Sequence, residues 1–110
     1  MHKRQAAVSI IVVNYDEWEL SAACLRSLHE LAYPRERFEV IFVDNASKYH
    51  PAAGEISPDF GNLRVIRNKT NEGFVRAVNR GIRCARRDAA YIALVNNDSV
   101  VDRGWLRALV

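Results

Sequence analysis

The chain has 110 residues, a hydrophobic fraction of 49%, a charged fraction of 26% and a formal net charge of +3. This length allows one domain with a modest core and is too short for two domains. The longest apolar run, residues 6–13, is far too short to span a bilayer. The mildly basic balance suits a nucleic acid, an anionic membrane surface or a phosphorylated ligand, and does not choose among them.

The N-terminal residues carry a few positive charges, but no small-residue cleavage site follows the apolar run. We therefore expect a disordered end over residues 1–6 and no secretory signal. Cys24 and Cys84 fall inside helical patterns and have no CxxC partner. Buried thiols are expected at both positions, in place of a disulfide or a metal site, which fits a cytoplasmic location.

Hydrophobic periodicity predicts strands that alternate with helices. The β-branched run over residues 7–13 is typical of a strand buried on both faces. Residues 17–31 change to a helical period, and Tyr33-Pro34 is expected to stop this helix. Its apolar stripe is formed by Leu20, Cys24, Leu25, Leu28 and Leu31.

Further elements follow the same alternation. Strands are predicted over residues 38–43, 63–67 and 90–95, and a last helix begins within residues 104–110. The stretch 45–62 is expected to be a loop with one helical turn. A helix between the last two strands has an apolar stripe of Phe74, Ala77, Val78, Gly81, Ile82 and Ala85.

This order implies βαβ units, a parallel sheet and right-handed crossovers. In such sheets, ligands bind outside the carboxyl ends of the strands, where the strand order reverses. Each predicted strand is followed by polar residues, namely Asn14-Tyr15-Asp16, Asp44-Asn45, Asn68 and Asn96-Asn97-Asp98. The sequence therefore predicts a polar cluster along one edge of the sheet.

Asp44 and Asn14, at two of these strand ends, can each be explained in two ways. Asp44 opens a DNAS segment, whose side chains are typical of an Asx turn or a cap. A carboxylate at a strand end can also accept a hydrogen bond from a base N–H or a ribose hydroxyl. The residues alone leave both explanations open.

The segment NEGFVRAVNRGI, residues 71–82, predicts a helix preceded by backbone that suits a phosphate. Asn71 is the expected N-cap, and Gly73 lets backbone approach a ligand closely. The free N–H groups and positive dipole end of the helix favour an anion. A capped helix with a buried stripe is the plainer explanation, although it does not account for Asn79. We expect Gly81 to allow close packing.

The same helix carries four arginines on the face opposite its apolar stripe: Arg76, Arg80, Arg83 and Arg87. A solvated basic face is the expected arrangement. Weak peripheral attraction to anionic lipid headgroups is the alternative.

The stretch VNNDSV, residues 95–100, places amide and carboxylate groups at the exit of a strand that we expect to be buried. A lone carboxylate between amides can bind Mg²⁺ or Mn²⁺ when phosphate oxygens and waters complete the coordination. Such a cation would neutralise charge that develops on a leaving diphosphate. A polar turn explains the same residues, so both interpretations stand.

Missing motifs exclude two other classes. A dinucleotide-binding oxidoreductase would have GxGxxG after the first strand, and a P-loop NTPase would have GxxxxGK[ST]; the sequence contains neither. A receiver domain would have paired acids directly after the first strand, where Asp16 and Glu17 are displaced past Tyr15.

The order of the motifs is more specific than any one of them. VSIIVVNY, VDNAS, NEGFVRAVNRGI, and LVNNDSVV followed by GWL resemble glycosyltransferase family 2, particularly its rhamnosyltransferase-like branch. The resemblance implies the N-terminal part of a Rossmann-like three-layer α/β sandwich, the nucleotide-diphospho-sugar transferase fold. The mostly parallel sheet would have strand order 3-2-1-4. Residues 7–110 would form the donor-binding half of a domain truncated at its C-terminus.

The same resemblance implies a candidate site. The base and ribose of the donor would be held by Val13, Asn14, Tyr15 and Asp44. The nucleotide-sugar pocket would be lined further by Asn71, Gly73, Asn79 and Asn97. Asp98 would be the last acid of a DxD-type motif and the ligand of Mg²⁺ or Mn²⁺, with Asn96 in place of the first Asp.

The implied function is transfer, with inversion, of a sugar from a UDP- or dTDP-sugar to a glycan or lipid-linked acceptor in cell-wall or polysaccharide biosynthesis. A nucleic acid partner is not expected, and the inner face of the membrane is a second expected location. Inverting transfer needs a base that deprotonates the acceptor hydroxyl, which the resemblance places beyond Val110. The alternative is a truncated nucleotide-binding module that binds the donor without turnover.

Overall fold

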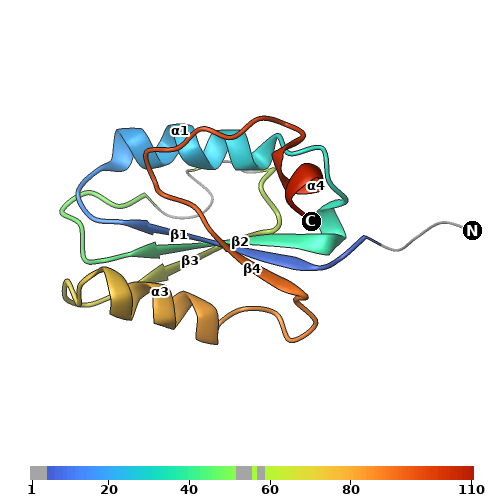
Figure 1. The fold of residues 1–110 in the computed structure, drawn as a ribbon. Coiled ribbons are helices and arrows are strands. Elements are labelled where there is room, and N and C mark those ends of the chain that lie inside the picture. Colours follow the sequence, from blue (N-terminus) through green and yellow to red (C-terminus); the bar gives the residue numbers. More distant parts are fainter. Residues whose placement is uncertain (1–4, 52–55, 57–58) are drawn as a thin grey trace, which may run out of the picture.

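Four apolar stretches form one parallel sheet in the computed structural model, which describes residues 5–51, 56 and 59–110 (Figure 1). Residues 1–4, 52–55 and 57–58 lie outside the described residues, and the expected disordered end and the helical turn expected within residues 45–62 fall partly on them. In chain order the elements are β1 (Val8–Asn14), α1 (Trp18–His29), a 3-10 turn η1 (Arg35–Arg37), β2 (Phe38–Asp44), β3 (Leu63–Arg67), α3 (Phe74–Arg83), β4 (Tyr91–Leu94) and α4 (Trp105–Leu109).

The strand order is β3-β2-β1-β4, and every pairing is parallel. This arrangement confirms the predicted α/β fold and its strand order. The register aligns Asn14 with Asp44, and Asp44 with Arg67, so these residues are neighbours on three adjacent strands. Asn14 and Asp44 are the last residues of their strands, so both strands end one residue later than the sequence predicts, because these two residues continue the ladder.

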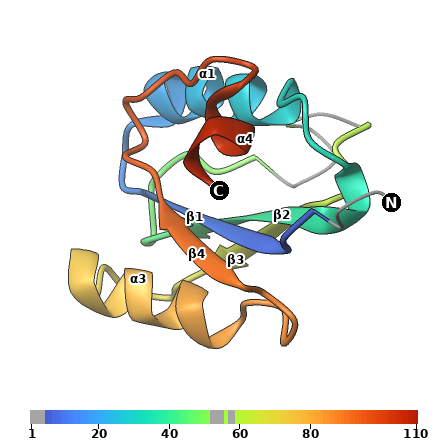
Figure 2. The same ribbon diagram turned by 45° about the vertical axis from the view of Figure 1, so that its right-hand side comes forward.

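Helices cover both faces of the sheet. Figure 1 shows α1 and α4 on one face and α3 on the other, and the turned view in Figure 2 shows the same layers. The larger core lies under α1, where Val8, Ile10 and Val12 of β1 are fully buried. The smaller core lies under α3 and is built on Ile11 of β1 and Ala77 of α3.

Gly81 sets the distance between α3 and the sheet. A Cβ atom at this position would lie 2.9 Å from Ile11 Cγ2 and 3.3 Å from Val43 Cγ2. Any side chain would therefore push the helix away from the strands. The expected role of Gly81 in close packing is confirmed.

The apolar stripes of both helices are less buried than predicted. Leu20 is 47% exposed because Ser21 occupies the buried face in its place, and α1 ends at His29 where Leu31 was expected. Phe74 and Ile82 of α3 are also exposed, at 53% and 40%. The side of α3 that carries these two residues is exposed, because α3 packs mainly over β1 and β2.

The expectation that the fourth strand is buried is wrong. Tyr91, Ile92 and Leu94 are each about half exposed. Within the described residues β4 pairs with β1 alone, so it is an edge strand, as Figure 2 shows.

Cys24 is a buried free thiol, as expected, whereas the free thiol of Cys84 is only partly buried, contrary to the expectation. Within the part of the chain that the structure describes, none of the helices has the length and apolarity needed to cross a bilayer.

The arginine face of α3 is only partly solvated, because Arg80 turns back to donate a hydrogen bond to Asn68.

Candidate functional site

A continuous chain of hydrogen bonds joins all four strand ends. Arg67 Nη1 donates to Asp44 Oδ2 at 3.2 Å, and Asn14 Nδ2 donates to Asp44 Oδ1 at 2.9 Å. Ser21 Oγ donates to Asn14 Oδ1 at 2.8 Å and accepts from Asn97 Nδ2 at 3.0 Å. The chain crosses the ends of β3, β2 and β1 and reaches the segment after β4. The predicted polar cluster at one sheet edge is therefore present.

Asp44 is buried and fully engaged. Its Oδ1 atom also accepts from Ser47 Oγ at 2.7 Å, and its Oδ2 atom accepts from Ser47 N at 2.9 Å. Ala46 takes a positive φ of 66° inside this turn. The explanation of DNAS as a turn held by side chains is correct, whereas a contact of Asp44 with a base or ribose stays a prediction.

Asn45 fixes the approach to α3. Its Oδ1 atom accepts from Asn68 Nδ2 at 2.9 Å and from Glu72 N at 3.1 Å, and its Nδ2 atom donates to Gly73 O at 3.1 Å. The sequence placed Asn45 at a strand end without assigning it to the site. A buried amide that serves two loops has no signature in a single sequence, so only the geometry reveals it.

Asn71 is not the N-cap of α3, contrary to the prediction. The helix begins at Phe74, with Gly73 at the capping position and no side-chain cap. Asn71 Oδ1 instead accepts from Gly73 N at 3.0 Å, because an Asx turn forms before the helix starts. Gly73 has a φ of 85°, which a residue with a Cβ adopts only with strain. The backbone around it is open, since a Cβ there would meet nothing within 4 Å.

A cavity of about 170 Å³ lies at this edge, between β1 and β4. The strand order reverses at that point, which is where ligands of open α/β sheets bind. The cavity is smaller than the roughly 300 Å³ or more of a typical ligand pocket, so it can hold only part of a nucleotide sugar. Its lining residues are Val13, Tyr15, Glu17, Asn45, Phe74, Val95, Asn96 and Asn97.

The predicted residues divide between two regions of the edge. Val13, Tyr15 and Asn97 line the cavity. Asn14 and Asp44 are register partners on β1 and β2, and both belong to the buried hydrogen-bond chain. The exposed side chain of Asn79, on α3, is not part of the cavity lining. Four further lining residues were not predicted as site residues: Glu17, Asn45, Phe74 and Val95.

Asp98 lies in the turn after β4 and is exposed, unlike Asp44. The turn is closed by Ser99 N, which donates to Asn96 O at 3.0 Å. No group of three or more His, Cys, Asp or Glu side chains suited to a metal occurs among the described residues. One reachable carboxylate beside amides fits a Mg²⁺ or Mn²⁺ ion that takes its other ligands from phosphate and water.

Cys24 shows that α1 lies close to this turn. Its Sγ atom contacts Asn96 O at 3.7 Å. Burial, and secondly the negative charge of Asp98, raise the pKa of the Cys24 thiol to about 11. A thiol with this pKa stays protonated at neutral pH and does not act as a nucleophile.

The family model of glycosyl transferase family 2 matches residues 9–110. The chain belongs to glycosyl transferase family 2. Among its relatives, this family 2 chain is 30% identical over 101 residues to glycosyltransferase AglE of Haloferax volcanii, covering 90% of the chain and 33% of AglE. The comparisons do not confirm the rhamnosyltransferase-like branch.

Solved structures resemble the family 2 chain over 94% of its length. The structure of S. aureus TarS 1-349 with UDP-GlcNAc has 25% identity, a TM-score of 0.83 and 30% of its length covered. Mannosyltransferase PcManGT from Pyrobaculum calidifontis, with GDP-Man and Mn²⁺, has 26% identity, a TM-score of 0.75 and 31% of its length covered. The chain thus spans about a third of AglE and of each of these two solved structures.

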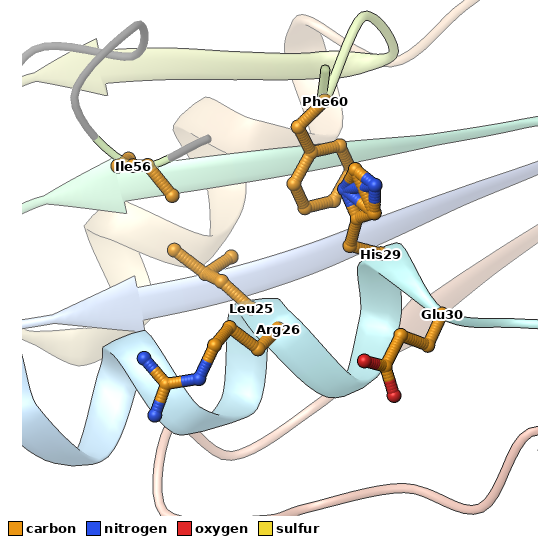
Figure 3. Close-up of a pocket in the computed structure, with 6 residues that line it drawn as sticks. All are labelled: Leu25, Arg26, His29, Glu30, Ile56 and Phe60. Atoms are coloured by element: carbon orange, nitrogen blue, oxygen red, sulfur yellow. The ribbon is translucent and has the colours of Figure 1, made fainter. Parts of the chain in front are cut away.

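A separate hollow of about 220 Å³ lies along the later turns of α1 (Figure 3). Figure 3 shows Leu25 and Ile56 pointing toward each other, and His29 lying against Phe60. The His29 and Phe60 rings pack edge to face with centroids 4.7 Å apart. None of the predicted site residues lines this hollow, so it is not a candidate for the nucleotide site of the family 2 chain.

Proposed function

We propose that this chain binds the nucleotide-diphospho-sugar donor of a family 2 glycosyltransferase at the carboxyl edge of its sheet. The observation that carries the proposal is the hydrogen-bond chain from Arg67 to Asn97, which gathers the polar ends of all four strands beside the cavity at the β1–β4 reversal. The family match over residues 9–110 supports the same ligand class.

In this proposal Asp98 would hold a divalent cation, which would supply positive charge beside the diphosphate of the donor. The open backbone at Gly73 and the N-terminus of α3 receive phosphate oxygens. Val13 and Tyr15, which line the cavity, pack against the nucleoside. Asn14 and Asp44 bind the base or ribose of the donor.

We propose a UDP- or dTDP-sugar as donor and a glycan or lipid-linked acceptor in the cytoplasm or at the inner face of the membrane, with inversion at the anomeric carbon. The TarS structure holds UDP-GlcNAc, and PcManGT holds GDP-Man with Mn²⁺. These ligands support a nucleotide sugar with a divalent cation and leave the base and sugar open. Because the chain covers about a third of its relatives, transfer is proposed for the whole protein. Binding without turnover is the alternative for the 110 residues.

A thermal-shift panel tests this proposal. UDP, dTDP and GDP, each with and without Mn²⁺, should raise the unfolding temperature of the chain, and the rise should be larger for a nucleotide that binds more tightly. We expect UDP or dTDP with Mn²⁺ to give the largest rise. The proposal is wrong if none of the three nucleotides changes the unfolding temperature at millimolar concentration. Cleavage of a matching labelled donor then separates turnover from binding alone.

A further inference from the structure

Asp44 has no acceptor position left for a ligand in this structure. A carboxylate offers about four lone-pair positions. Asn14 Nδ2 and Ser47 Oγ bond to Oδ1, while Ser47 N and Arg67 Nη1 bond to Oδ2. A nucleoside can therefore reach the Asp44 carboxylate only if one of these donors leaves.

The buried donors are held by further bonds. Asn14 and Ser47 are each 1% exposed. Ser47 Oγ also accepts from Asp16 N at 2.8 Å, and Asn14 Oδ1 accepts from Ser21 Oγ at 2.8 Å. Removing either donor would break the DNAS turn or the contact between β1 and α1.

Arg67 is held much less firmly. Its side chain is 41% exposed, whereas that of Asp44 is 2% exposed. Its two contacts, to Asp44 Oδ2 and to Ser47 O, are both 3.2 Å long. A partly exposed ion pair is weak, because water solvates the guanidinium well once the pair opens. Arg67 is thus the donor that can be exchanged.

We propose that Arg67 is a latch on Asp44. In the free chain its guanidinium occupies Oδ2, and a base N–H or ribose hydroxyl of the donor replaces it on binding. This inference rests on the proposed function, since it requires Asp44 to contact the nucleoside. Arg67 is then a positioning residue that sets the affinity for the nucleoside part of the donor. It leaves the affinity for the diphosphate part, near Asp98, unchanged.

The test uses UDP and inorganic pyrophosphate, each with Mg²⁺, in calorimetric titrations of the 110-residue chain. Arg67→Met removes the cation and keeps the length of the side chain. We expect it to bind UDP about two- to fivefold more tightly than the wild type, because no ion pair has to open. Its affinity for pyrophosphate should not change. Arg67→Lys keeps a cation near Asp44 and should bind UDP as the wild type does.

Arg64→Met is the matched control. Arg64 lies on the same strand, and its Nη1 atom pairs with the partly buried Glu39 at 3.2 Å, away from the strand ends. This variant should bind both ligands as the wild type does. Circular dichroism checks that Arg67→Met is folded, and Arg67→Gln replaces it if it is not.

Equal or weaker UDP binding by Arg67→Met would overturn the latch. Weaker binding would make the guanidinium itself a contact of the nucleotide. If the wild-type chain binds neither UDP, dTDP nor GDP, the proposed function fails first and the latch fails with it.

Discussion

Asp44 and Asp98 both lie at the carboxyl edge of the sheet, Asp44 at the end of β2 and Asp98 in the turn after β4, but their surroundings differ. Asp44 ends a strand buried on both faces, so its carboxylate is enclosed by Asn14 and Ser47. Asp98 follows an edge strand and lies in an exposed turn. One carboxylate is therefore suited to organising the loops, and the other to binding a cation from solvent.

The role of Asp98 is tested by its neutralisation. Asp98→Asn should remove most of the gain in UDP affinity that Mn²⁺ provides, because an amide is a poor ligand for a hard cation. Calorimetry with and without Mn²⁺ measures this gain. Asp102→Asn, an exposed acid four residues further along, is the control and should keep it. An unchanged Mn²⁺ effect in Asp98→Asn would remove Asp98 as the metal ligand.

Cys24 gives a prediction about pH. Its folded-state pKa is about 11, above the ordinary value of 9.0, so the unfolded chain loses this proton first as the pH rises. The Cys24 contribution to the free energy of unfolding is fully present below pH 9 and should fall by about 2 kcal/mol between pH 9 and 11. Urea unfolding of the wild type and of Cys24→Ala should show curves that converge over this range. Parallel curves would contradict the pKa assignment.

At the scale of single residues, the sequence predicted which side chains gather and not how they bond. Polar residues after four strands were enough to place Asn14, Asp44 and Asn97 at one edge. The hydrogen-bond partners depend on side-chain rotamers and loop shape, as the roles of Asn45 and Ser47 show. Asn71 was misplaced because an N-cap and an Asx turn use the same residue type.

Among the elements, α3 depends most on a single residue, Gly81, for its packing against the sheet. It lies close to the sheet because Ala77 and Gly81 face β1 and β2. This small-residue face brings the N-terminus of the helix to the strand ends, where Asn45 bonds to Glu72 N and Gly73 O. The helix is thus aligned with the cavity by packing and by one buried amide.

Gly81→Ala tests the packing. The new methyl group would lie 2.9 Å from Ile11 Cγ2, so we expect a loss of about 1–2 kcal/mol in the free energy of unfolding even after the better helix propensity of Ala. Gly61→Ala is the control, because a Cβ there would meet nothing within 4 Å. Urea unfolding measures both variants. An equal or increased stability of Gly81→Ala would show that α3 can move away without cost.

Asn45→Ala tests the amide. The loss of three hydrogen bonds at a buried site should cost about 2–3 kcal/mol and speed hydrogen exchange at the Glu72 amide. Asn79→Ala, at an exposed position on the same helix, should change the stability by less than about 0.5 kcal/mol. If exchange at Glu72 stays slow in Asn45→Ala, the start of α3 is held by other contacts.

The periodicity of apolar residues predicted the type and order of the strands and α-helices, with bounds that differ from the observed ones by no more than two residues at most ends. Residues 63–67 form the third strand as expected. The prediction failed for the exposure of Leu20, Ile82 and β4, because periodicity gives the face of an element and not the number of neighbours that cover it.

At the scale of the whole molecule, the fold gathers polar groups at one edge of the sheet and leaves some apolar side chains exposed elsewhere. The edge carries the hydrogen-bond chain and the cavity at the β1–β4 reversal. The exposed apolar side chains of Ile82, Ile92 and Leu94 are not among the predicted site residues. The polar strand ends meet at one edge because all strands are parallel, and the strand order places β1 between β2 and β4. The central claim is that a nucleotide diphosphate binds at the polar edge.

Titration of the ¹⁵N-labelled chain with UDP and Mg²⁺, followed by amide chemical shifts, tests this claim most directly. We expect the largest shift changes at Tyr15, Gly73, Asn97 and Asp98, with the amides of Arg26 and His29 along the hollow of α1 unchanged. Shift changes confined to that hollow, with the strand ends unaffected, would contradict it.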